Sequence, residues 1–494
     1  MSEQLDDLAK EDNTDSQFVT LRGIISETEK LSKAFLPIQH ENILNSLLNE
    51  IHPINFREKV GFDSESERLS KKHYIICCID EILEVAKKNH WGLCRNGDFI
   101  YLYNGCYWSL IDSQEMQTFI GEAAEKMGVD KFDAKYYAFK EQLYKQFLTT
   151  SILPKPKERK NSVLINLLNG TFEITPMEQI IRAPKREDFL KYQLPFEFNE
   201  KATAPIFQNF LNQVLPEIEK QMILAEFFGY LFIKQSVLKL EKTLLLYGKG
   251  SNGKSVIFEI ICALLGGSQN VSNYSLNSLT DEKGYHRANL ANKLLNYASE
   301  ISGNLEASLF KQLVSGEPIE ARLPYCAPFI LTDYAKLVFN CNELPFVTEH
   351  THAFYRRFTI IPFDVTIEEK DQDRELSQKI IDSELSGVFN WVLDGLRRLL
   401  ANKKITYCES VNNQLEMYKM QSDTVRLFLD DGHYLKSVDE CLPLQDIYYS
   451  YRCYCSENGY KACSKKTFGE RLKNISFTIE RKSYGMAVYA KKGV

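Results

Sequence analysis

The 494-residue chain is 44% hydrophobic and 26% charged, an ordinary globular composition that leaves room for about three domains. Its formal net charge of −6 excludes a protein that is basic throughout, so a surface for nucleic acid must be local. The acidic N-terminus, MSEQLDDLAKEDNTD, is not a secretory signal, and no apolar run reaches the ~18–20 residues of a membrane-spanning helix. We therefore expect a cytoplasmic protein with no membrane partner.

Cysteine spacing gives little support for a metal site. The 12 cysteines are scattered along the chain without Cys-x-x-Cys pairs at zinc spacing. Cys453, Cys455 and Cys463 are three candidate zinc ligands at poor spacing. Reduced thiols are the better interpretation.

The first 205 residues are expected to form two units. Residues 1–90 combine an acidic tail with apolar residues at helical spacing, which indicates a helical region. Residues 91–205 are predicted to form an α+β domain with two hairpins, turned at Asn104–Gly105 and at Asn169–Gly170. Aromatic and basic residues interleave in this domain, which suits either a nucleic-acid surface or ordinary packing.

Residues 206–405 alternate between predicted helices and strands, which indicates an α/β nucleotide-binding core. Two helices over 205–235 lead into an apolar strand that ends at position 247. Further strands are expected at 294–298, 337–341 and 358–362, followed by a helix over 375–403.

The segment GKGSNGKS fits the phosphate-loop pattern G-x-x-x-x-G-K-[ST] between a predicted strand and a predicted helix. Glycines let the backbone N–H groups face phosphate oxygens, and the helix start adds the positive end of its dipole. Lys254 would reach the β and γ phosphates, and the Ser255 hydroxyl would coordinate the metal. The expected cofactors are therefore ATP and Mg²⁺; the alternative is a glycine turn that binds nothing. The predicted ATP-binding residues are Gly248, Lys249, Gly250, Ser251, Asn252, Gly253, Lys254 and Ser255.

Polar residues follow the later strands where an ATPase needs them. Glu300 ends the strand of LLNYASE, so its carboxylate is a candidate to orient or deprotonate water, to help hold Mg²⁺, or both. Asn342 ends the strand of KLVFNCNELP and is a candidate to orient that water. Arg356 and Arg357 offer a finger for the transition-state charge. Taken singly, each has an ordinary alternative: a surface glutamate, a turn asparagine, a salt-bridged arginine.

The ordered series GKGSNGKS, KLLNYASE, KQLVSGEPIEAR, KLVFNCNELP and YRRFTIIPF resembles the superfamily 3 helicases, in the phage and plasmid primase-helicase branch of the AAA+ ATPases. The similarity extends upstream to INLLNG and YQLPFEFNEKA and spans roughly residues 90 to 490. It implies an AAA+ P-loop core and a homo-oligomeric ring, expected to be a hexamer. Such a ring hydrolyses ATP between subunits and draws single-stranded DNA through a central channel.

Residue by residue, the resemblance makes Lys254 and Ser255 the Walker A pair, and Glu300 the Walker B acid. Asn342 would be sensor 1, and Arg356, with Arg357, the finger that acts on the neighbouring subunit. Many relatives carry a primase domain before this region. About 90 residues precede it here, without a paired-acid metal motif, so we expect a helicase that works with a separate primase and polymerase.

The resemblance also implies a hairpin that projects into the channel, within the segment from Lys311 to about Phe329. Relatives commonly have a basic residue after the aromatic at the tip, whereas Cys326 follows Tyr325 here. This departure either weakens DNA contact at the tip or shifts it to other side chains. The expected DNA contacts are Lys311, Arg322 and the stacking face of Tyr325.

Residues 415–494 are predicted to form a winged-helix domain, with a helix, a turn at Asn458–Gly459, a second helix and two strands. Residues 461–494 carry nine basic and two acidic side chains, a local surplus that indicates contact with duplex DNA. A solvated basic tail on a packing domain is the alternative. The candidate contacts are Lys465, Lys466, Arg471, Lys473, Arg481 and Lys482.

The function expected from these features is an ATP-dependent replicative DNA helicase of a phage, plasmid or genomic island. One alternative is an ATP-switched initiator that binds and remodels an origin without processive unwinding; the Cys326 departure keeps this alternative open. A non-enzymatic initiator is disfavoured by the complete set of ATPase residues. A metabolic kinase is disfavoured because nothing beyond the loop supports a small-molecule acceptor site, and a dedicated primase because the metal-binding acids are missing.

Overall fold

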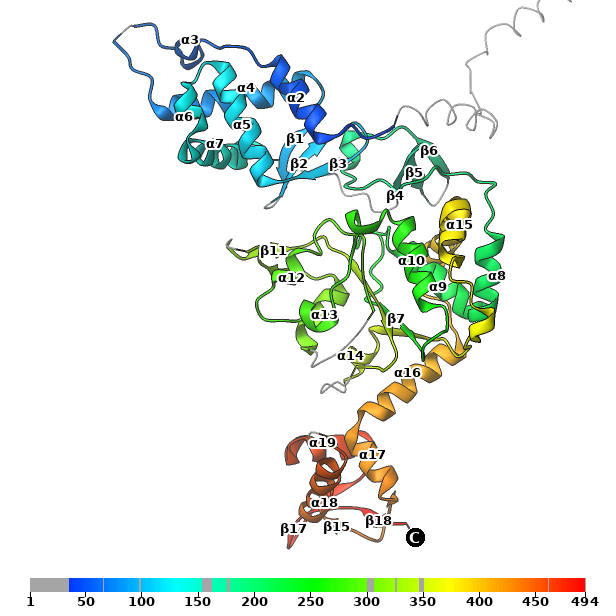
Figure 1. Cartoon of the computed structure of the whole chain (residues 1–494). Helices are drawn as coiled ribbons and strands as arrows, with labels where there is room; N and C mark the ends of the chain where they lie inside the picture. Colours follow the sequence, from blue (N-terminus) through cyan, green and yellow to red (C-terminus); the bar gives the residue numbers. More distant parts are fainter. Residues whose placement is uncertain are drawn as a thin grey trace, which may run out of the picture.

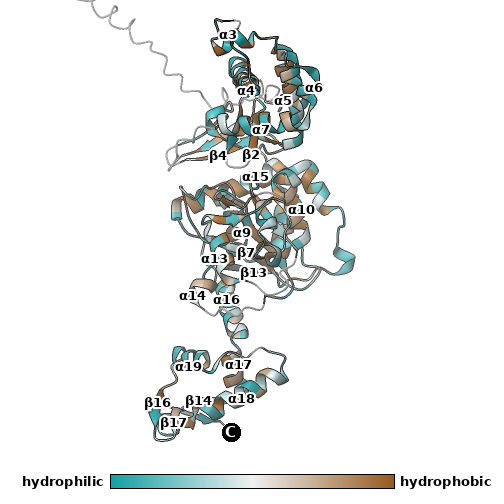
Figure 2. Ribbon diagram, turned by 90° about the vertical axis from the view of Figure 1, so that its left-hand side faces the viewer, coloured by the Kyte–Doolittle hydropathy of each residue, from teal (hydrophilic) through white to brown (hydrophobic). Residues whose placement is uncertain are grey.

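The computed structural model describes residues 35–64, 66–96, 99–152, 162–175, 178–299, 306–324, 327–345, 351–460 and 462–493. The predicted acidic tail lies outside these ranges. The chain is a mixed helix and sheet structure whose regions follow one another in chain order, with helix α16 (Glu409–Ser422) leading from the central region to the last (Figures 1 and 2). Within the described residues, no helix has both the length and the apolar character needed to cross a membrane.

The N-terminal region packs helices against a small antiparallel sheet of order β1-β2-β3. One hydrophobic core runs from Ile43 to Phe147, so residues on both sides of the predicted boundary at 90/91 share a single core. The elements are α2 (His40–Glu50), α3 (Phe56–Val60), α4 (Lys71–Lys88), β1 (Leu93–Asn96), β2 (Phe99–Tyr103), β3 (Trp108–Ile111), α5 (Ser113–Met127), α6 (Lys131–Lys135) and α7 (Tyr137–Thr150).

Both predicted hairpins are present. Between β2 and β3, the Asn104 side-chain oxygen accepts two backbone N–H bonds, of 3.1 and 2.9 Å, and closes the turn. In the second hairpin, Gly170 has a φ of 136°, and a Cβ there would lie 2.6 Å from the Arg182 carbonyl oxygen, so the turn requires glycine. The second sheet, of order β4-β5-β6, consists of β4 (Val163–Leu167), β5 (Gly170–Ile174) and β6 (Gln179–Arg182).

The central region is built on a five-stranded sheet of order β13-β7-β12-β9-β8, in which every neighbouring pair is parallel. Successive residues of β7 serve different cores: Leu244 and Leu246 join one hydrophobic cluster and Leu245 joins another. The strands are apolar on both faces because both faces of a parallel sheet are covered. The strands are β7 (Thr243–Tyr247), β8 (Val271–Ser272), β9 (Leu295–Ala298), β12 (Lys336–Cys341) and β13 (Phe358–Pro362).

Long helices pack on one face of this sheet. At Gly395, a Cβ would lie 2.2 Å from the Ala225 carbonyl carbon, so only glycine allows α9 and α15 to approach so closely. The hydrophobic cluster that contains Leu244 and Leu246 also includes residues of β4 and β5. This shared core joins the second sheet to the central region across the predicted boundary at 205/206. The helices are α8 (Pro205–Val214), α9 (Ile218–Tyr230), α10 (Lys254–Leu264) and α15 (Leu376–Asn402).

Shorter elements cover the other face. Phe310, Phe354 and Phe358 pack their rings together there, with centroids 4.9 to 5.3 Å apart. The segment predicted to carry a hairpin contains an antiparallel pair, β10 with β11. The elements are α11 (Leu276–Leu279), α12 (Tyr285–Ala288), α13 (Ala307–Ser315), β10 (Ile319–Ala321), β11 (Phe329–Leu331) and α14 (His352–Tyr355).

The C-terminal region has a core of its own, which includes Phe428, Tyr451 and Phe468. The predicted order of helix, turn, helix and strands is present, and β14 pairs with β18 in an additional two-stranded sheet. The elements are α17 (Thr424–Asp431), β14 (Tyr434–Lys436), β15 (Leu442–Pro443), α18 (Leu444–Glu457), α19 (Lys465–Asn474), β16 (Ile479–Lys482), β17 (Gly485–Val488) and β18 (Ala490–Lys492).

Candidate active site

The predicted phosphate-binding sequence lies in the loop between β7 and α10, at the carboxyl end of an interior strand of the parallel sheet. The Gly248 N–H donates to the last carbonyl of β12 at 3.1 Å, which holds the start of the loop beside that strand. Ser251 and Gly253 have φ values of 59° and 84°, so the loop turns sharply before the helix. The first turn of α10 begins with Lys254 and the exposed Ser255. A helix that starts at such a loop can bind an anion.

The side chains of Asn252 and Lys254 stabilise the loop through internal hydrogen bonds. The buried Asn252 donates to a backbone carbonyl just after β13 at 3.2 Å, and its side-chain oxygen accepts from Lys254 Nζ at 2.9 Å. Lys254 Nζ also donates to the Gly248 carbonyl at 2.6 Å. Burial lowers the pKa of Lys254, because desolvation disfavours the charged ammonium. A phosphate oxygen bound nearby would stabilise that charge. Lys249 and Gly250 lie on the surface of the loop.

The predicted water-orienting residue lies beside this loop. Asn342 directly follows β12, the strand that pairs with β7, and its side chain is exposed at the carboxyl edge of the sheet. Strand β9 pairs with β12 on its other side and ends at the same edge. Glu300, two residues beyond β9, lies outside the described residues.

The described residues contain no group of three or more His, Cys, Asp or Glu side chains arranged to hold a metal ion. The three weak zinc candidates, Cys453, Cys455 and Cys463, are among the described residues, and they do not form such a group.

The two predicted finger arginines have different surroundings. Both precede β13, which runs parallel to β7, so they lie at the amino edge of the sheet, opposite the phosphate loop. The Arg356 side chain is 45% exposed and forms an ion pair with Glu241. Arg357 is 7% exposed and donates to the Ser315 hydroxyl at 2.9 Å and to the Ala353 carbonyl, so it connects α13 and α14 inside its own chain. Arg356 is therefore the arginine of the pair that a neighbouring molecule could reach.

Glu241 was not among the residues that sequence patterns suggested. It precedes β7, has a φ of 54°, and accepts ion pairs from Arg356 and from Lys239, the latter at 3.2 Å. Burial opposes ionisation, but these two cations hold the pKa of Glu241 below its usual value. No local motif marks such a residue, because its partner Arg356 lies more than a hundred positions away in the chain.

The predicted DNA contacts of the central region lie near the β10–β11 pair. Lys311 is half-buried on α13, and Arg322 is exposed directly after β10. The Arg322 backbone N–H donates to the Gly284 carbonyl at 3.2 Å. Buried Arg287 supports the same strand by donating to the Glu320 carbonyl at 2.8 Å. Tyr325, at the predicted tip, lies outside the described residues.

The basic candidates of the C-terminal region divide into two groups. Arg471 is 14% exposed at its side chain and forms an ion pair with Asp423 at 3.5 Å, which links α19 to the start of α17. Lys482 donates to the Tyr489 hydroxyl at 2.7 Å and lies 5.0 Å from the centre of that ring. The exposed candidates, on α19 and β16, are Lys465, Lys466, Lys473 and Arg481.

Replacing Gly248 with alanine should destabilise the central region by about 1–3 kcal/mol, the usual cost of overpacking. A Cβ at Gly248 would lie 2.4 Å from Asn252 Nδ2 and 2.5 Å from the Phe363 carbonyl oxygen. Gly250→Ala is the matched control, because no atom lies within 4 Å of its Cβ. Urea unfolding of both variants measures the difference. Equal stabilities would contradict the close packing of the loop start.

Three segments of the chain match known protein families. Residues 86–216 match the family described as "D5 N terminal like", and residues 420–492 match "Poxvirus D5 protein-like". Residues 246–357 match a "Family of unknown function (DUF5906)", and this segment contains the phosphate loop, Asn342 and both arginines. The chain is therefore similar to D5-like proteins on both sides of the candidate site.

Individual relatives are distant. The viral protein "Putative helicase 121R" of Invertebrate iridescent virus 3 is 22% identical over 338 residues, which are 59% of this chain. The match covers 35% of that protein's length. The A-form apo structure of the NrS-1 C-terminal region has a TM-score of 0.44 at 13% identity, over 83% of this chain and 98% of that one. Another apo structure of that region, 305–718, has a TM-score of 0.44 at 12% identity, over 85% and 99%.

Proposed function

We propose that this protein is an ATP-hydrolysing DNA helicase of the superfamily 3 type, which replicates the DNA of a phage, plasmid or genomic island. One observation carries the proposal. The phosphate loop and Arg356 lie at opposite edges of one parallel sheet, so one copy of the chain cannot bring them together. In a head-to-tail ring the arginine of each copy would complete the site of the next, which is the arrangement of an ATPase with a finger supplied in trans.

The nucleotide would be ATP with Mg²⁺. Lys254 would bind the β and γ phosphates, and the loop N–H groups would contribute further hydrogen bonds. The exposed Ser255 hydroxyl offers an oxygen ligand of the kind Mg²⁺ accepts, alongside nucleotide oxygens and water. Bound Mg²⁺ would neutralise phosphate charge. Glu300 and Asn342 would orient the attacking water.

DNA would bind at two places. Single-stranded DNA would pass through the channel of a ring, expected to be hexameric, and contact Lys311, Arg322 and Tyr325. Duplex DNA would bind the C-terminal region as a winged helix. The helicase would depend on a separate primase and polymerase. The similarity to D5-like segments and to a viral protein named as a helicase supports this assignment.

Strand displacement on a forked DNA duplex with ATP tests the function. We expect the wild-type protein to separate the strands and to hydrolyse ATP faster when DNA is present. ATPase activity that DNA stimulates without unwinding would favour the alternative, an ATP-switched initiator that remodels an origin. Absence of ATPase activity under ring-forming conditions would contradict both.

Duplex binding by the C-terminal region should weaken when Lys466 and Lys473 are replaced together by alanine. Both side chains are exposed on α19, and each phosphate contact that is lost should lower the slope of log K against log salt by about 1. Fluorescence anisotropy with a labelled duplex over a salt series measures this slope. Arg471→Ala is the contrasting variant: it should destabilise the region by removing the Asp423 ion pair. An unchanged slope in the double variant would contradict the duplex surface.

A further inference from the structure

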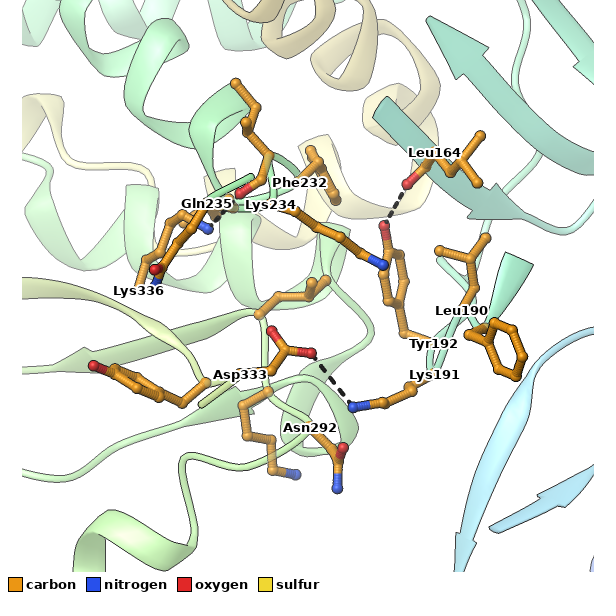
Figure 3. A pocket seen from close by; sticks show the side chains of 16 residues that line it. Leu164, Leu190, Lys191, Tyr192, Phe232, Lys234, Gln235, Asn292, Asp333 and Lys336 are labelled. Carbon is orange, nitrogen blue, oxygen red and sulfur yellow. Dashed lines mark hydrogen bonds and ion pairs between the residues drawn. The ribbon is translucent and has the colours of Figure 1, made fainter. Parts of the chain in front are cut away.

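A second cluster of cations lies far from the phosphate loop. Figure 3 shows a pocket between the segment after α9, the segment after β6 and the start of β12. Its volume is ≈110 Å³, several times the ~15 Å³ needed to admit one water. Among the described residues that line it, four are lysines and one is acidic. They are Lys191, Lys234, Lys293, Lys336 and Asp333.

Three of these lysines act on the single carboxylate. Lys191 Nζ lies 3.4 Å from Asp333 Oδ2 (Figure 3), and Lys234 and Lys336 affect the same carboxylate through their charge at longer range. Desolvation opposes ionisation of Asp333, although its side chain is 76% exposed, and the charges of the three lysines hold its pKa below the usual value. One carboxylate cannot neutralise three ammonium groups, so the pocket keeps a surplus of positive charge.

Two of the three lysines, Lys336 and Lys191, are held in place by their surroundings, whereas Lys234 is exposed. Lys336 Nζ donates to the Ile233 carbonyl at 2.8 Å and lies 4.6 Å from the centre of the Tyr230 ring. Lys191 Nζ lies 5.6 Å from the centre of the Tyr101 ring, which belongs to the N-terminal sheet. Burial lowers the pKa of Lys336 to about 8. The charge on Lys336 is therefore one that an additional anion would stabilise.

We propose that Lys191, Lys234 and Lys336, the basic pocket, bind a phosphate group, supplied by the backbone of single-stranded nucleic acid or by a free phosphate. The basic pocket is distinct from the phosphate loop. Lys336 begins β12 and Asn342 follows that strand, so the pocket and the loop are separated by the strand's length, about 16 Å. One phosphate cannot occupy both.

The position of Asp333 favours nucleic acid as the source of the phosphate. Asp333 lies two residues after β11, at the base of the pair whose tip is the proposed DNA contact in the central region. Phe329 of β11 also contacts Phe99 of the N-terminal sheet, with ring centroids 5.8 Å apart. A strand that passes the tip could therefore place a backbone phosphate in the basic pocket, at the junction of the two regions.

The test measures binding without ATP, in the full chain carrying Lys254→Ala so that the phosphate loop does not bind the probe. The probes are inorganic pyrophosphate, followed by calorimetry, and labelled oligo(dT), followed by anisotropy. Lys191→Met and Lys336→Met should each weaken binding of at least one probe by about tenfold or more. A loss for oligo(dT) alone identifies the backbone as the source, and a loss for pyrophosphate alone identifies a free phosphate.

Asp333→Asn separates binding from a structural role. Removing the carboxylate increases the positive surplus, so this variant should bind the probe several-fold more tightly, whereas a merely structural ion pair predicts weaker binding. Lys370→Met controls for general charge, since Lys370 is 73% exposed and pairs only locally with Glu368 among the described residues. Unchanged binding in both lysine variants, or weaker binding in Asp333→Asn, would overturn the proposal. Because no ATP is present, the result is independent of helicase activity.

Discussion

Replacing Lys254 with alanine should reduce ATP hydrolysis by about 10²-fold or more, the usual effect of removing a charged group that stabilises the transition state. The Lys254 ammonium is buried and is held by the Gly248 carbonyl at 2.6 Å and Asn252 Oδ1 at 2.9 Å, beside the start of α10. It is therefore preorganised to contact an anion at that helix start. Steady-state ATPase rates and the affinity for a fluorescent ATP analogue measure the effect.

The matched control for this variant is the neighbouring lysine. Lys249 is exposed, and its carbonyl oxygen rather than its side chain contacts Lys254, at 3.3 Å. Lys249→Ala should therefore retain most of the activity. Equal losses in the two variants would indicate a general electrostatic effect. Full activity in Lys254→Ala would contradict the assignment of the loop.

Arg356→Ala should lower ATP turnover by about 10³-fold while leaving ATP affinity nearly unchanged, because a finger acts on the transition-state charge. The residue lies at the edge of the sheet opposite its own phosphate loop, so in the proposed ring its effect would fall on a neighbouring subunit. Mixing tests this directly. Arg356→Ala and Lys254→Ala subunits should each be inactive alone, but a mixed ring would contain sites that pair an intact Lys254 with an intact Arg356.

Two further variants sharpen the mixing experiment. Glu241→Gln removes the ion pair that holds Arg356 and should change turnover more than ATP affinity. Arg357→Met should instead destabilise the fold, because Arg357 is buried against Ser315. Recovery of activity in the mixture supports a shared site. Failure to recover in mixtures that demonstrably form joint rings would mean that Arg356 does not act in trans.

Local patterns were sufficient for much of the architecture. The strands expected at 294–298, 337–341 and 358–362 correspond to β9, β12 and β13. The turn that contains Asn104–Gly105 closes the first predicted hairpin, and GKGSNGKS lies between a strand and a helix. The second hairpin turns one residue earlier than predicted, because Gly170 already pairs with Leu167. These features are readable because hydrophobic period, turn residues and a glycine-rich loop act over a few neighbouring positions.

Packing decided what those patterns left open. Arg356 and Arg357 are adjacent in sequence, and both satisfied the expectation of a finger; the fold buries one and exposes the other. Hydrophobic cores cross both predicted boundaries, at 90/91 and 205/206, so the change in hydrophobic period near Gly92 did not mark a change of core. A residue's exposure depends on which distant segments cover it, and periodicity does not report those segments.

The basic pocket shows the same limit. Lys191, Lys234 and Lys336 come from three separate parts of the chain, and each is an ordinary lysine within its local sequence. They line one pocket with Asp333 because β12 begins beside the segments that follow α9 and β6. The strand, the loop and the helix of the candidate ATP site could therefore be predicted from the sequence, because their residues follow one another in the chain. The fold supplied the sites whose charges come together over long stretches of chain, because electrostatic interactions depend on distance in space and not on separation in sequence.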